Sequence, residues 1–120
     1  MFQIRLKNLK NDMENINNLK IEKGTVNFLI KKDTLVNPES IPLFSISPEG
    51  GSIFMIKDSD NKLKVFFVAL GKGRQDLIFD LSTYKFIGQK YTFTFTWSLN
   101  SKKLLLYIDG VLVKSVSIPF

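Results

Sequence analysis

Residues 91–97 read Tyr-Thr-Phe-Thr-Phe-Thr-Trp, and this alternation decides how the rest of the chain is interpreted. Side chains two residues apart point to the same side of a β-strand. The aromatic residues Tyr91, Phe93, Phe95 and Trp97 therefore share one face, and the three threonines share the other. The stretch predicts a strand whose aromatic face belongs to the core.

A hairpin is predicted directly after this strand. Leu104, Leu106 and Ile108 share a face, and Asp109-Gly110 supplies the two residues that a tight type I′ turn requires. The apolar residues of the two hairpin strands then meet one core. We expect these pairs across the turn: Ile108 with Val111, Leu106 with Val113, and Leu104 with Ser115.

These segments carry a resemblance to a known family. Residues 93–97, followed by 103–113, resemble the closing segment of laminin-G-like domains, which are jelly-roll sandwiches related to concanavalin A and the pentraxins. Residues 24–31 resemble an early inner strand of that family, and residues 42–46 resemble the next one. The resemblance covers residues 24–118 and implies an all-β fold of two packed antiparallel sheets.

The family often shows an aromatic residue and a histidine where the closing strand begins. This chain has Lys90 and Thr92 there, so no binding residue is carried over from the family.

The remaining runs support the same architecture. Val26, Phe28 and Ile30 alternate toward the core, and turn residues recur at intervals of about eight to twelve residues. We predict roughly nine or ten strands and no helix in one sandwich domain over residues 1–120. Residues 8–18 are predicted as a loop or one helical turn, and residues 32–40 as a surface loop. Pro42 is expected to begin a strand or to lie in an edge strand.

Composition restricts the classes of function. The 120 residues, 44% of them hydrophobic, suffice for one core. The absence of cysteine excludes disulfides and thiolate metal sites, and the absence of histidine removes the commonest general base. The net charge is +6, but lysines are spread along the chain, so nucleic-acid binding is not expected. No run reaches the ~18 apolar residues of a membrane span, and no signal-peptide pattern is present, so we expect a cytoplasmic protein if this sequence is the full native chain.

Catalysis is not expected either. Glucanases with the related fold need two carboxylates that project from one strand. Asp58 and Asp60 have the required spacing, but they lie in the predicted turn 58–61. A solvated turn offers neither the burial nor the rigidity that raises the pKa of a catalytic acid. We therefore predict a binding protein and not an enzyme.

Two turns supply the candidate ligand contacts. The run 58–61 offers oxygen atoms to calcium, although Asp and Asn also cap tight turns. The run 71–74 offers exposed amides and two cations to an anion, or it is a plain hairpin connection. Calcium, held by Asp58 and Asp60, is the candidate cofactor. The predicted rim site comprises Asp58, Asp60, Asn61, Arg74 and Gln75.

Two predicted strands, 52–57 and 63–70, are apolar on both faces, so we expect another part of the structure to shield each face from water. The outer residues either line a concave ligand face or are covered by the amino-terminal segment or another copy of the chain. Sugar hydroxyls need polar partners, which such a face lacks, so its chemistry favours protein contact. The candidate interface comprises Phe54, Ile56, Phe66 and Val68.

Two hypotheses for the function stay open. In the first, the chain is a lectin-like module that binds carbohydrate or another polar ligand at the rim or the concave face. In the second, it is a structural or assembly protein that uses the apolar face for homo-oligomerisation or for contact with another protein.

Overall fold

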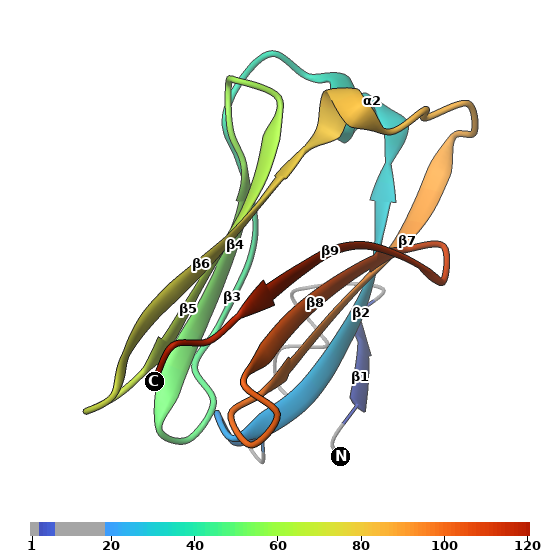
Figure 1. The fold of residues 1–120 in the computed structure, drawn as a ribbon. Coiled ribbons are helices and arrows are strands. Elements are labelled where there is room, and N and C mark those ends of the chain that lie inside the picture. Colours follow the sequence, from blue (N-terminus) through green and yellow to red (C-terminus); the bar gives the residue numbers. More distant parts are fainter. Residues whose placement is uncertain (1–2, 7–18) are drawn as a thin grey trace.

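The computed structural model of the chain describes the backbone of residues 3–6 and all of residues 19–120. Within these ranges nine strands form two facing sheets (Figure 1). The predicted loop at residues 8–18 lies outside the described residues. Sheet A has the order β1-β2-β7-β8-β9, with β1 Gln3–Leu6, β2 Lys23–Lys31, β7 Lys90–Ser98, β8 Lys103–Ile108 and β9 Val111–Ser117. Sheet B has the order β3-β4-β5-β6, with β3 Ile41–Ile46, β4 Gly51–Lys57, β5 Lys62–Ala69 and β6 Gly73–Asp80.

Strand β7 is the centre of sheet A, as its alternation predicts. Its four inward aromatic residues are at most 5% exposed. They pack against both neighbouring strands, since Phe95 pairs with Val26 of β2 and with Leu106 of β8. Among the strands in the described residues, all pairs are antiparallel except β1 and β2, which are parallel and depart from the predicted arrangement.

Trp97 shows how closely the core is packed. Its side chain is 1% exposed, and its Nε1 donates to the carbonyl oxygen of Lys20 at 3.3 Å. The ring lies directly over Gly24, where an added Cβ would come within 2.2 Å of the ring. Glycine at position 24 is therefore required by the approach of the tryptophan.

The β8–β9 hairpin confirms one predicted pair and corrects two. Ile108 pairs with Val111, and both turn residues have positive φ, 48° and 82°. A bulge then shifts the register between Tyr107 and Leu106, with one extra residue on β9, so that Leu106 pairs with Lys114 and Leu104 with Val116. The extra residue brings a valine, in place of Ser115, opposite the buried Leu104. The same shift replaces Val113 by the exposed Lys114 opposite Leu106, so the edge strand β9 does not present a continuous apolar face to β8.

Two short helical segments correct the prediction of no helix. Helix α2, Lys32–Val36, lies in the predicted surface loop and is anchored by Leu35, which is 1% exposed. It ends before Pro38, because the residue preceding a proline disfavours the helical region. A 3-10 turn, η2, spans Leu81–Thr83, and the Asp80 side chain accepts a hydrogen bond from the Ser82 amide at its start. No helix in the described ranges is long and apolar enough to cross a membrane.

Edge strand β3 contains Pro42, as predicted, and its register with β4 shifts between Pro42 and Phe44. The sandwich core is formed by the inward side chains of both sheets. From sheet B it receives Ile53, Met55, Val65 and Phe67, all of which are fully buried.

Candidate binding site

In the β4–β5 turn, the Asp58 side chain is bonded to other groups of the chain. Asp58 is 7% exposed, and its Oδ1 accepts from the backbone amides of Asp60 (3.0 Å) and Lys62 (2.9 Å). Its Oδ2 lies 2.9 Å from Nζ of Lys64. Burial pushes the pKa of the Asp58 carboxyl upward, but the bonds from Lys64 and the two amides outweigh it and hold the pKa below its ordinary value. Both carboxylate oxygens are thus engaged within the chain.

The turn contains two further residues of the predicted rim site, Asn61 and Asp60. Asn61 has φ 62°, a left-handed conformation typical of tight turns, and its carbonyl accepts from the Leu81 amide at 3.0 Å. Asp60 is exposed. Among the residues that the structure describes, no three His, Cys, Asp or Glu side chains gather in a way that could hold a metal ion. The calcium site stays a prediction.

Arg74 and Gln75 do not join the turn residues in one site. They pair with Val68 and Phe67, so as successive residues they project to opposite faces of β6. Val68 lies six positions along β5 from Lys62, where the 58–61 turn ends, which corresponds to about 20 Å. The five residues of the predicted rim site therefore occupy opposite ends of strand β5.

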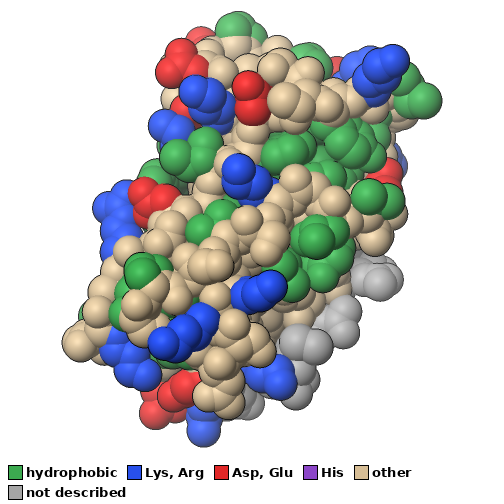
Figure 2. Space-filling model, in the orientation of Figure 1, with side chains coloured by type: hydrophobic (Ala, Val, Ile, Leu, Met, Phe, Trp, Pro, Cys, Tyr) green, Lys and Arg blue, Asp and Glu red, His purple; other side chains and the backbone are tan. Residues whose placement is uncertain are grey.

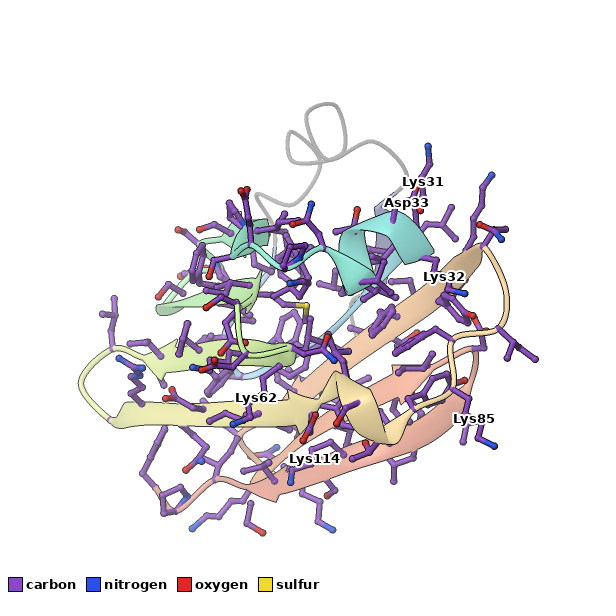
Figure 3. The ribbon with its side chains drawn as sticks, turned by 90° about the horizontal axis from the view of Figure 1, so that it is seen from above. Lys31, Lys32, Asp33, Lys62, Lys85 and Lys114 are labelled. Atoms are coloured by element: carbon purple, nitrogen blue, oxygen red, sulfur yellow. The ribbon has the colours of Figure 1, made fainter. Side chains whose placement is uncertain are left out.

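The lysines are also dispersed. Figure 3, which looks down on the sandwich from above, shows Lys31, Lys62, Lys85 and Lys114 on different elements. Figure 2 shows basic side chains scattered over one side of the molecule from end to end. Within the described ranges only Lys64 and Arg74 have a carboxylate within 4 Å.

The four predicted interface residues do come together. They lie on the outer side of sheet B, which we call the phenyl face and which the strand register arranges in three rows. The rows are Ser52, Val68 and Arg74; then Ser45, Phe54, Phe66 and Asp76; then Pro42, Ile56, Lys64 and Ile78. Phe54 is 37% exposed and Ile78 is 44% exposed, while Ile56, Phe66 and Val68 are half-buried.

Two phenyl rings occupy the middle of this face. The rings of Phe54 and Phe66 are stacked, with centroids 6.0 Å apart and planes at 11°. Arg74 places its Cζ 4.7 Å from the centroid of the Phe66 ring and binds Asp76 through Nε (2.7 Å) and Nη2 (3.0 Å). Phe66 is therefore held between a second ring and a guanidinium group.

The sequence interpretation missed two features. Lys57 is fully buried, although it was assigned no role; it lies in phase with Ile53 and Met55, and that phase is the signal for an inward side chain. The Arg74–Asp76 pair was also missed, although a spacing of two on a strand places both residues on one face.

The comparisons with known proteins agree with this architecture. No family model matches the chain, and no curated protein matches it. Among solved structures it is similar to domains LG4-5 of the mouse laminin alpha1 chain, with a TM-score of 0.60 and 19% identity. The match covers 82% of this chain and 24% of that chain, so this chain spans about a quarter of the length of the solved one. The fold is that of a laminin-G-like jelly-roll sandwich, as the resemblance of the closing segment predicts.

Proposed function

We propose that this chain is a non-catalytic binding module that contacts another protein through its phenyl face. The observation that supports the proposal is the stacked pair of Phe54 and Phe66, accessible at the middle of an outer sheet face. Exposed aromatic side chains at the centre of a face are the typical anchors of protein interfaces. Their removal from water on docking stabilises a complex by about 25 cal/mol per Å² of apolar surface.

The state of the flanking charges favours a protein partner over a sugar. Sugar rings stack on free aromatic faces, but Phe66 has Phe54 against it and the guanidinium of Arg74 over it. Arg74 already binds Asp76 with two hydrogen bonds. The face thus offers largely apolar contact with charges that are already neutralised, which suits the core of a protein interface.

The lectin-like alternative places carbohydrate or another polar ligand at the rim, with calcium on Asp58 and Asp60. A ligand there must compete with the internal bonds of Asp58, whose two oxygens already accept three hydrogen bonds. This competition lowers the affinity that the turn can provide, because each lost bond must be replaced.

Photo-crosslinking tests the proposal. A benzophenone amino acid replaces Ser45, an exposed residue of the phenyl face, and in a control protein it replaces Ser115, an exposed serine on the other sheet. We expect discrete protein adducts from position 45 that disappear in a Phe54→Ser/Phe66→Ser background, and none from position 115. An adduct between two copies of the chain at position 45 supports the proposal as well.

A glycan array with and without calcium provides the opposing arm. Glycan binding that survives Phe54→Ser/Phe66→Ser but is lost in Asp58→Asn/Asp60→Asn, together with calcium-dependent thermal stabilisation, overturns the proposal in favour of the rim site. Adducts that form equally from positions 45 and 115 overturn it as well.

A further inference from the structure

We infer that the phenyl face binds a second copy of this chain, face to face, about a twofold axis that runs along the strands between β4 and β5. This inference rests on the proposed function and names the partner. It follows from the charges of the face, from its strand register and from its size.

The phenyl face is electrically neutral within a basic protein. It carries Lys64 and Arg74, and each of these cations is bonded to a carboxylate, Asp58 and Asp76 respectively. Two positive and two negative charges sum to zero, whereas the whole chain has a net charge of +6. Two copies that meet through this neutral face repel each other less than their net charges alone would imply.

The register decides which twofold axis is compatible with the charges. An axis along the strands between β4 and β5 places β4 over β5 of the second copy and β3 over β6. Phe54 then opposes Phe66 of the second copy, Asp76 opposes Ser45, and Lys64 opposes Ile56. Arg74 comes over the end of β3, whose six residues are uncharged. No like charges meet in this arrangement.

The alternative axis, across the strands, is disfavoured. It places each residue of the middle row over its own counterpart, so Asp76 faces Asp76 of the second copy. Two opposed carboxylates in an interface destabilise it. Both axes keep the strands of the two stacked sheets aligned, as face-to-face sheets prefer, so the charges decide between them.

The size of the face predicts a weak dimer. Its four strands are six to eight residues long. With ~4.8 Å between strands and ~3.3 Å per residue, the footprint is about 450 Å² per copy. A standard interface buries about 800 Å² per partner, so we expect a dissociation constant on the order of 100 µM.

Sedimentation velocity between about 10 µM and 1 mM spans that constant and tests the inference on the purified full chain. Ser45→Lys places an ammonium group over Asp76 of the second copy, and Ser45→Asp places a carboxylate there. We expect the first to tighten the dimer and the second to weaken it, each about two- to fivefold. The same substitutions at Ser115 are the matched control and change nothing. Because Ser45 and Ser115 are both exposed, all four variants are expected to fold.

A second pair of variants addresses the aromatic centre. Phe54→Ser/Phe66→Ser is expected to weaken the dimer by at least about tenfold, and Leu29→Ser, at an apolar residue 51% exposed on the other sheet, to leave it unchanged. Added salt is expected to tighten the wild-type dimer, because it screens the repulsion between two basic copies.

The outcomes separate this inference from the proposed function. If the chain stays monomeric at 1 mM, the inference that a second copy is the partner is overturned. If crosslinked adducts from position 45 to another protein are still found, the proposed function stands. A dimer that responds neither to the Ser45 substitutions nor to the phenylalanine substitutions forms elsewhere and overturns the inference. If the position-specific adducts are absent as well, both proposals fail.

Discussion

Replacing Lys57 by methionine tests the most unusual contact in the core. The Lys57 side chain is fully buried, and its Nζ donates to the backbone carbonyls of Glu39 (2.8 Å), Asp58 (2.9 Å) and Asn37. Within the described ranges it has no carboxylate partner. The ammonium group thereby fastens the link between α2 and β3 to the end of β4.

Two opposing effects set the magnitude for Lys57→Met. Methionine donates to none of the three carbonyls, and an unsatisfied buried acceptor costs about 1–3 kcal/mol. Two of the three bonds are only part-buried, so water replaces some of that loss. Methionine also avoids the desolvation of an ammonium group, which offsets part of the remainder. We expect a net loss of about 2 kcal/mol in the free energy of unfolding, or a fall in Tm of about 6–10 °C.

Urea denaturation followed by the fluorescence of the single tryptophan, Trp97, measures this change, because that side chain is 1% exposed in the fold. Lys72→Met, at an exposed turn residue, is the control and should stay within about 0.5 kcal/mol of wild type. If Lys57→Met is as stable as wild type or more stable, the carbonyl contacts contribute less than desolvation removes, and the reasoning is refuted.

Two further predictions concern the packing under Trp97 and the turn at Asp58. Gly24→Ala inserts a Cβ within 2.2 Å of the Trp97 ring and should destabilise the fold by about 2–3 kcal/mol in the same denaturation assay. The control is Gly88→Ala, whose added Cβ has its nearest contact at 3.5 Å and should change stability by less than about 1 kcal/mol. Equal effects of the two substitutions contradict the close approach of the Trp97 ring to Gly24. Because the pKa of Asp58 lies below its ordinary value of 3.8, the carboxylate stabilises the fold fully above that value, and this contribution is lost as the pH falls through the lowered pKa. Wild type should therefore lose stability relative to Asp58→Asn below about pH 4, and parallel stability curves from pH 7 to pH 3 speak against that role.

Local sequence pattern was enough to predict most strands and the side of each that faces the core, although not the two helical segments. The alternation in residues 91–97 places four aromatic side chains on one side of a strand wherever that strand lies, because the two-residue period is a property of the extended backbone. The turn at Asp109-Gly110 is likewise local, since positive φ is required only of those two residues.

Properties that depend on a distant segment of the chain could not be read from local pattern. The β-bulge between Leu106 and Tyr107 brings Val116 opposite Leu104 and Lys114 opposite Leu106, and this register depends on how β9 pairs with β8, which the sequence of β9 alone does not show. The rim residues are separated because successive turns of a meander fall at opposite ends of the shared strand. Burial of Lys57 depends on the distant carbonyls of residues 37 and 39, and exposure of the phenyl face depends on whether another layer covers it. Each of these outcomes is set by contacts between segments far apart in the chain, whereas strand pattern and turn chemistry are set by neighbours.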